Sequence, residues 1–236
     1  MTDPGDQRPD PRAFRTTRWT RVMAARGDSA DARTALSELC EIYYAPVRAF
    51  IGHAWRGEDP DDLTQAFFAR LLERANLEQV DRERGRFRSY LLGAVKHFIR
   101  DHRAKLHAEK RGGSAEHVGV EDAGLSVPAP SEALFDREWA VALIARAFAS
   151  LEAGESSPRT FEVLKPWLHG AAADLSQAGA AAELGISEGA VKVAIHRLRK
   201  RFRRHIRSEI AQTVPDAGEI SGELNYLIEV LGGREA

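Results

Sequence analysis

Apolar residues recur along most of this chain with the period of an α-helix, and the alternating pattern of a β-strand is scarce. Helical patterns cover residues 13–25, 30–55, 60–75, 86–110, 132–151, 158–169, 174–184 and 187–212, and a short last helix follows Pro215. A chain of 236 residues is long enough for two small domains. We therefore predict an all-α fold that consists of two small helical domains.

The segment between the two groups of helices, SAEHVGVEDAGLSVPAPS, has the composition of a flexible linker. The first residues, MTDPGDQRPDPR, are polar and contain proline, which predicts a disordered leader rather than a signal peptide. The predicted boundaries are a leader at 1–12, a first domain at 13–112, a linker at 113–131, a second domain at 132–213 and a tail helix at 214–236. The tail carries an apolar stripe (Leu224, Leu227, Ile228 and Leu231), which we expect to pack on its own module or, as the alternative, to recruit a regulator.

The gross composition restricts the compartment. Cys40 is the single cysteine, so an internal disulfide is excluded, and its setting LSELCEIYY predicts a thiol in a helical core. No run of about 18 apolar residues is present, so we expect no membrane insertion and a cytoplasmic protein.

Charge is segregated although the net charge is only −1. One basic run comprises Arg82, Arg84, Arg86, Arg88, Lys96, Arg100, Arg103, Lys105, Lys110 and Arg111. A second comprises Lys192, Arg197, Arg199, Lys200, Arg201, Arg203, Arg204 and Arg207. Two separate basic runs favour two contact points on a polyanion, and solvated helix faces are the alternative.

The second basic run belongs to a pattern that is typical of a helix-turn-helix. A short helix at 178–184 precedes Gly185, which can adopt the left-handed conformation that ends a helix, and Ser187 is a good N-cap for the next helix. On that helix Val191, Ile195, Leu198 and Phe202 form one buried stripe. A basic surface helix in an ordinary bundle is the alternative.

The N-terminal half of such a second helix enters the major groove of DNA, where its side chains reach base edges. Lys192 and Arg197 are suited to donate to guanine, and Val193 to contact a thymine methyl group. The later arginines, from Arg199 onward, are suited to neutralise phosphates.

In the first domain, DPDDLTQAFFARLLER predicts an amphipathic helix. Asp61 and Asp62 lie in its first turn, where the helix dipole favours acids, and no histidine or glutamate stands at ligand spacing on this helix. We therefore predict neither a catalytic nor a metal site there.

The next helix interleaves basic and aromatic residues, in ERGRFRSYLLGAVKHFIRDHRAKLHAEKRGG. Aromatic rings on which bases stack, among arginines that follow phosphates, are typical of proteins that bind single-stranded nucleic acid. Some of these rings must belong to the core, and Phe98 is the first candidate for that; a wholly structural role for all of them is the alternative.

Three motifs in order, DPDDLTQAFFARLL, GRFRSYLLGAVKHFIRDHRAK and ISEGAVKVAIHRLRKRFR, resemble sigma factors of bacterial RNA polymerase of the extracytoplasmic function (ECF) type. The opening FRTTRWTRVMAARG resembles one subgroup of that family. The resemblance covers about residues 14–112 and 132–213. It implies that the first domain is a sigma region 2 bundle and the second a sigma region 4 helix-turn-helix.

The resemblance also implies roles for individual residues. Contacts with the polymerase β′ clamp helices are expected from Asp61, Asp62, Gln65 and Phe68. Melting and binding of the −10 promoter element are expected from Arg86, Phe87, Arg88, Tyr90, Lys96, His97, Arg100 and Arg103. Recognition of the −35 duplex is expected from Ser187, Lys192, Val193, His196, Arg197, Arg199 and Lys200. Tyr90 stands where many members have Trp, His97 where Asn is common, and Val193-Ala194 where Ser-Arg is frequent, so the promoter sequence is not transferable.

The expected function is thus promoter recognition by a subunit of RNA polymerase, with no enzymatic activity, cofactor or metal of its own. The expected partners are core RNA polymerase, through the β′ clamp helices and the β flap, promoter DNA, and an anti-sigma factor or another regulator. The alternative is an autonomous helix-turn-helix regulator with a sensing N-terminal domain.

Overall fold

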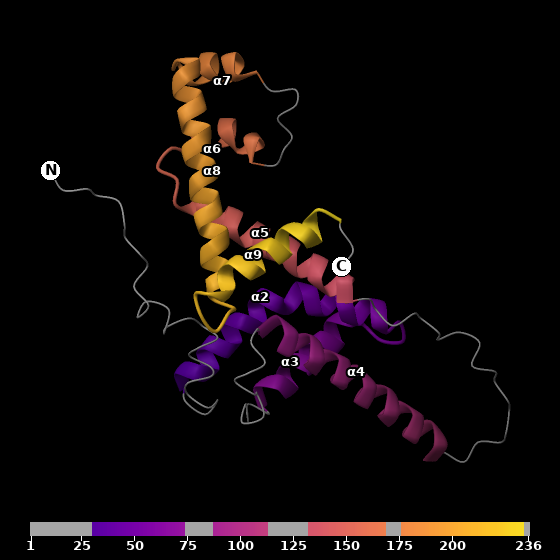
Figure 1. The fold of residues 1–236 in the computed structure, drawn as a ribbon. Coiled ribbons are helices and arrows are strands. Elements are labelled where there is room, and N and C mark those ends of the chain that lie inside the picture. Colours follow the sequence, from indigo (N-terminus) through magenta and orange to yellow (C-terminus); the bar gives the residue numbers. More distant parts are fainter. Residues whose placement is uncertain (1–29, 74–86, 113–131, 169–175, 234–236) are drawn as a thin grey trace. The chain divides into compact units, whose positions relative to one another are not determined.

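The computed structural model describes residues 30–73, 87–112, 132–168 and 176–233, and every regular element among them is a helix (Figure 1). The elements are α2 (Ala30–Ala54), α3 (Pro60–Glu73), α4 (Phe87–Gly112), α5 (Glu132–Ala153), α6 (Pro158–Leu164), the 3₁₀-helix η4 (Lys165–Trp167), α7 (Gln177–Leu184), α8 (Glu188–Ala211) and α9 (Glu219–Leu231). The predicted all-helical class is confirmed for these residues. The predicted leader, the helix at 13–25 and the linker lie outside them.

Side-chain caps and prolines set several helix ends. The carboxylate of Asp59 accepts a hydrogen bond from the backbone N–H of Asp61 (2.7 Å), and Pro60 opens α3 with the fixed φ that suits a first helical position. The helix predicted at 158–169 is shorter than expected, because α6 ends at Leu164 and continues as the tighter η4. Pro166 lacks the N–H that an α-helix would need there.

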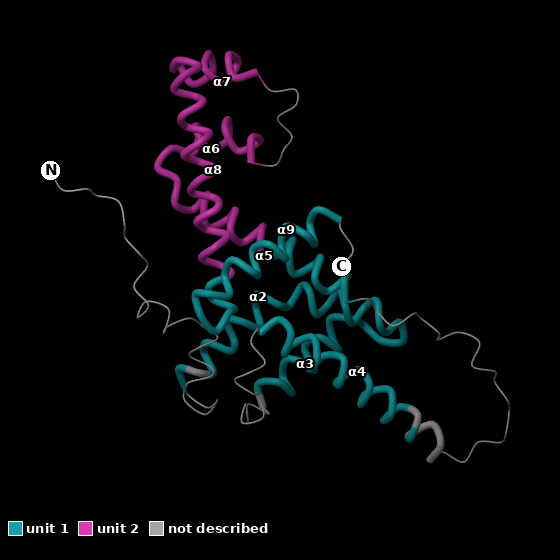
Figure 2. The backbone as a smooth tube through the Cα atoms, in the orientation of Figure 1, with its two compact units in different colours: residues 1–142, 211–236 teal, residues 143–210 magenta. Residues whose placement is uncertain are grey.

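The described chain divides into two compact units, which Figure 2 distinguishes by colour. Unit 1 holds the described residues up to 142 together with those from 211 onward, and unit 2 is formed by residues 143–210. This division differs from the predicted boundary at 132 and from the predicted end of the second domain at 213. The first half of α5 and the whole of α9 belong to unit 1.

The core of unit 1 forms around α2. The ring of Tyr43 lies edge-on to that of Phe87 on α4 (centroids 5.1 Å apart), and Phe50 meets Phe135 on α5 (6.0 Å). These four side chains are almost completely buried. Burial removes their large apolar surfaces from water, which is the main stabilising contribution to such a bundle.

The tail helix α9 packs within unit 1, by a face that differs from the predicted stripe. Its buried residues are Ile220, Glu223 and Leu227, whereas Ile228 and Leu231 are 61% and 47% exposed. The tail was expected to pack on its own module, the one with the helix-turn-helix; it belongs instead to unit 1, where Glu223 pairs with Arg88 of α4.

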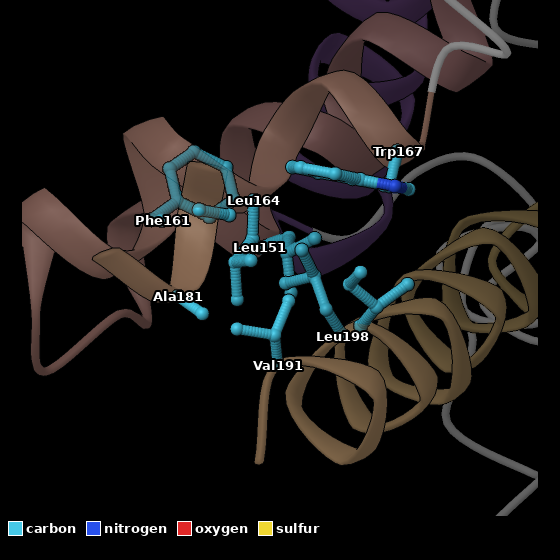
Figure 3. Packing of buried hydrophobic residues seen from close by; sticks show 9 residues of the cluster. Leu151, Phe161, Leu164, Trp167, Ala181, Val191 and Leu198 are labelled. Atoms are coloured by element: carbon cyan, nitrogen blue, oxygen red, sulfur yellow. The ribbon is translucent and has the colours of Figure 1, made fainter. Parts of the chain in front are cut away.

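Unit 2 has its own hydrophobic core, in which α5, α6, η4, α7 and α8 meet (Figure 3). The buried residues are Leu151, Phe161, Leu164, Trp167, Ala180, Ala181, Val191, Ile195 and Leu198, and Phe202 is partly buried against them. The stripe predicted on the second helix of the helix-turn-helix is thus confirmed. The core holds α8 by one face and leaves the other faces of the helix to solvent.

In the part of the chain that the structure describes, no helix combines the length and apolarity that a bilayer crossing requires.

Candidate nucleic-acid interface

The turn between α7 and α8 has the geometry that the sequence predicts for a helix-turn-helix. Gly185 has φ 67°, the left-handed conformation that favours glycine, and the N–H of Ile186 donates to the carbonyl of Ala181 (3.0 Å). The hydroxyl of Ser187 accepts from the N–H of Ala190 (3.2 Å). These local bonds end one helix, start the next and fix the direction in which α8 leaves the turn.

The N-terminal half of α8 presents a polar face to solvent. Val191 and Ile195 are buried, while Lys192, Val193, His196 and Arg197 are exposed. This half of α8 therefore carries the expected base-reading side chains outward, with Val193 49% exposed despite being apolar.

Two arginines of α8 have protein partners instead. Arg199 donates from Nε (3.3 Å) and from a terminal nitrogen (3.1 Å) to the carbonyl of Trp167 at the end of η4. Arg201 forms an ion pair with Glu155, whose side chain is only 11% exposed. Both head groups hold unit 2 together, and Arg199, although expected among the −35 contacts, is engaged in this way.

Val193 and Arg197 also border a shallow groove between α8 and α6. Thr160, Phe161 and Leu164 form its other wall. Gly189 and Ala190 of α8 also line this groove.

On α3 the four expected polymerase contacts fall into two groups. Asp62 and Gln65 are exposed and lie close to each other along one side of the helix. Asp61 is held by Arg48, with oxygen–nitrogen distances of 2.6 and 2.9 Å, and this guanidinium holds the pKa of the carboxyl below its ordinary value.

Phe68 is a core residue. Its side chain is 7% exposed and its ring is stacked on that of Tyr44 (6.0 Å), so the prediction of a surface contact at this position is wrong for this structure. The physical reason is that α3 is packed on two sides, with Phe68 against Tyr44 of α2 and Phe67 against Phe98 of α4.

At the start of α4 the structure also departs from the expected −10 surface. Phe87 is 0% and Arg88 7% exposed, so the prediction that both meet DNA directly is wrong for this structure. The N–H of Phe87 donates to the carbonyl of Thr213 (3.3 Å), which joins α4 to the segment before α9. Arg86 lies outside the described residues.

The remaining expected residues of α4 are at least partly accessible. Lys96, His97 and Arg100 are exposed, with Lys96 in an ion pair with Glu132. Arg103 is partly buried and donates to the carbonyl of Ala54 (2.6 Å). Among the expected residues, the exposed basic side chains therefore lie between residues 96 and 100, and Lys105 is a further exposed basic residue of α4.

Tyr90 and His97 meet at a pocket between α3 and α4. Its other lining residues are Phe67, Arg70, Leu71, Ala94 and Phe98. Arg70 lies over the ring of Phe98 (5.9 Å) and donates to Asp101 (2.7 Å), and this bond holds the pKa of Asp101 below its ordinary value. Phe98, the predicted core aromatic, is 9% exposed and confirmed as such.

The sequence interpretation missed a buried charged cluster in unit 1, made by Arg88, Asp136, Glu223 and Tyr226. Arg88 forms ion pairs with Asp136 and with Glu223 (3.1 Å), and the Tyr226 hydroxyl donates to Asp136. Burial alone lowers the pKa of Arg88, but the two carboxylates more than offset it and the pKa is raised. A signal was present: Glu223 stands three residues after Ile220 and four before Leu227, so it falls on the same helical face as two apolar residues.

Among the described residues, no cluster of three or more His, Cys, Asp or Glu side chains has the arrangement of a metal site. Comparisons of the chain with protein-family models, with curated proteins and with solved structures found no match. Interpretation of function therefore depends on the residues of this chain and on their geometry.

Proposed function

We propose that this chain is a sigma factor of the ECF type, which binds core RNA polymerase and directs it to promoters. The observation that carries the proposal is the turn from α7 through Gly185 to α8, followed by an exposed half-helix with Lys192, Val193, His196 and Arg197. A short helix, a glycine turn and a second helix with such a face form the usual framework for reading duplex DNA in the major groove.

The exposed residues of α8 form two groups along the helix, one that reads bases and one that binds phosphates. Lys192, Val193, His196 and Arg197 read base edges of the −35 element. Lys200, Arg203 and Arg204 are exposed further along the helix and neutralise phosphates, which supplies affinity without sequence preference.

Unit 1 supplies the second half of the activity. Asp62 and Gln65 on α3 contact the polymerase clamp, and Lys96, His97 and Arg100 on α4 contact the unpaired −10 strand or its flanking phosphates. Stacking on an aromatic side chain is worth about 1–3 kcal/mol per base, comparable with the few kcal/mol needed to flip a base from the duplex. The chain performs no bond chemistry, needs no cofactor and acts in the cytoplasm.

The pocket beside Tyr90 favours a second candidate, an autonomous helix-turn-helix regulator. A pocket lined by aromatic rings together with Arg70 and His97 has the chemistry to hold a small planar ligand. Such a regulator would bind duplex DNA tightly by itself and would not bind the polymerase.

Retention on immobilised core RNA polymerase, followed by run-off transcription, separates the two candidates. A sigma factor is retained and starts transcripts at defined sites. Asp62→Lys should reduce retention, whereas Glu41→Lys, an equal charge reversal at an exposed position of α2, should leave it unchanged. Tight binding of promoter DNA by the chain alone, with no retention on the polymerase, would support the regulator instead.

A further inference from the structure

The head group of Arg88 is enclosed by side chains from α5 and α9. Its guanidinium carbon lies 4.4 Å from the ring centre of Tyr226 and 4.9 Å from that of Trp139. Its Nε donates to Glu223 at 3.1 Å, and a terminal nitrogen pairs with Asp136. One helix, α9, thus supplies both an aromatic ring and a carboxylate to a single arginine.

The carboxylate of Glu223 and the ring of Tyr226 together offer Arg88 an anion and a planar ring, as a nucleotide does with its phosphate and its base. An arginine binds phosphate through charge-assisted hydrogen bonds and stacks its planar face on bases or aromatic rings. Glu223 provides the anion and Tyr226 provides the planar ring. On Arg88, α9 therefore occupies the positions that the phosphate and the base of an unpaired nucleotide would take.

Several features of α9 indicate that this helix can detach locally from the rest of unit 1. The helix has 13 residues, a length at which an isolated helix is marginal in water, and its first residue follows Gly218 without a side-chain cap. Three of its residues (Ile220, Glu223 and Leu227) are buried, while Ile228 and Leu231 are exposed. Segments with few buried apolar contacts open locally at free energies below that of global unfolding.

We propose that α9 is a built-in cover of a nucleotide-binding site at Arg88. When α9 is docked, Glu223 and Tyr226 fill the site. When α9 is released, Arg88 keeps Trp139 and its ion pair with Asp136 on α5, and it offers the Nε and the face that Glu223 and Tyr226 leave to an unpaired nucleotide of single-stranded nucleic acid. The identity of that strand as the −10 strand rests on the proposed function, whereas the cover itself does not.

The test compares two substitutions that remove the same charge from α9. Glu223→Gln removes a partner of Arg88, and Glu229→Gln removes a charge from the exposed side. The probe is a fluorescein-labelled single-stranded oligodeoxynucleotide of mixed sequence, and the readout is fluorescence anisotropy with the full chain. We expect Glu223→Gln to tighten binding about fivefold or more, because the open state becomes more populated, and Glu229→Gln to change it less than about twofold. Equal effects of the two substitutions would overturn the proposal.

A deletion of residues 216–236 provides the second test. It should tighten binding of the same probe and steepen its dependence on the logarithm of salt concentration by about 0.7, the value for one additional phosphate on a single strand. In this deleted chain, Arg88→Gln should cancel most of the gain. If the deletion abolishes cooperative unfolding, α9 is an indispensable wall of unit 1, and the proposal fails.

Hydrogen exchange of the unaltered chain checks the opening directly. Amides of α9 should exchange faster than those of α2, by about tenfold or more. Identical protection of both helices would show that α9 does not open separately. None of these three measurements involves the polymerase. If they give the expected results but the chain is not retained on core RNA polymerase, the sigma assignment fails while the proposal that α9 covers Arg88 stands.

Discussion

The basic residues of α8 differ in what their head groups contact. Arg199 donates to a backbone carbonyl, and Arg201 pairs with Glu155, so both stabilise unit 2. Lys192, Arg197 and Lys200 are exposed. A count of positive charges along the sequence therefore overstates the number of residues that are available to DNA, and the difference matters for the salt dependence of binding.

Arg197 and Lys200 should respond differently to truncation. Arg197→Ala should weaken binding of the selected −35 duplex by about 1–3 kcal/mol while it affects unrelated duplexes less, because a base contact is lost. Lys200→Ala should weaken all duplexes alike and lower the salt slope by about 1. Both are measured by competition binding of the polymerase complex, with duplexes selected on the unaltered protein. A uniform loss for Arg197→Ala would make Arg197 a phosphate contact.

The thiol of Cys40 should be inert in the folded protein. Cys40 is 7% exposed, and burial, together with the nearby charge of Glu41, raises its pKa to about 12. At pH 8 the reactive thiolate is therefore scarce, and a disulfide reagent such as dithionitrobenzoate should modify Cys40 only after denaturant is added. Rapid release of the chromophore from the native protein would show that this part of α2 opens.

At the scale of the element, the junction of α7 and α8 depends on the backbone of Gly185. An alanine there meets no neighbouring atom within 4 Å, so its effect comes only from the left-handed φ of 67°. Gly185→Ala should lower the free energy of unfolding by about 1–2 kcal/mol, as measured by denaturant titration followed by circular dichroism.

Gly189→Ala is the matched control for this junction. Gly189 lies in the first turn of α8, its φ is not positive, and the closest side-chain atom to an added methyl is Ser187 Oγ at 3.9 Å. Alanine favours a helix, so the variant should be as stable as the parent or more stable by up to about 1 kcal/mol. Equal destabilisation by the two alanines would show that the turn conformation is not the cause.

Elements whose ends and faces are determined locally could be predicted from the sequence. Gly185 and Ser187 mark the turn, and the spacing from Val191 to Leu198 marks the buried face of α8. The helix-turn-helix could therefore be predicted from the sequence. The end of α6 was missed by a few residues, because Pro166 allows a tighter 3₁₀ turn that still buries Trp167. The exposure of Lys192, Val193, His196 and Arg197 followed from the same local rules.

At the scale of the whole molecule, sequence patterns within single helices were insufficient to predict which distant residues contact one another. The contacts of Arg88 join residues 48 and 135 positions away along the chain. The helical spacing places Arg88 on the apolar face of α4, with Leu91 and Leu92, but nothing nearby in the sequence indicates which distant acids would pair with it there. For that reason the predicted −10 surface included two core residues, and the tail was grouped with the wrong part of the chain.

The buried cluster makes the stability of unit 1 depend on three distant segments at once. Arg88→Met leaves Asp136 and Glu223 buried without their cation and should destabilise the protein by about 3–5 kcal/mol in denaturant titration. Combining it with Asp136→Leu, Glu223→Leu and Tyr226→Phe removes both acids and the hydroxyl that would lose its acceptor. Because desolvation of charge offsets much of the attraction in a buried ion pair, this variant should recover most of the lost stability. If it stays as unstable as Arg88→Met, shape rather than charge compensation holds α4, α5 and α9 together.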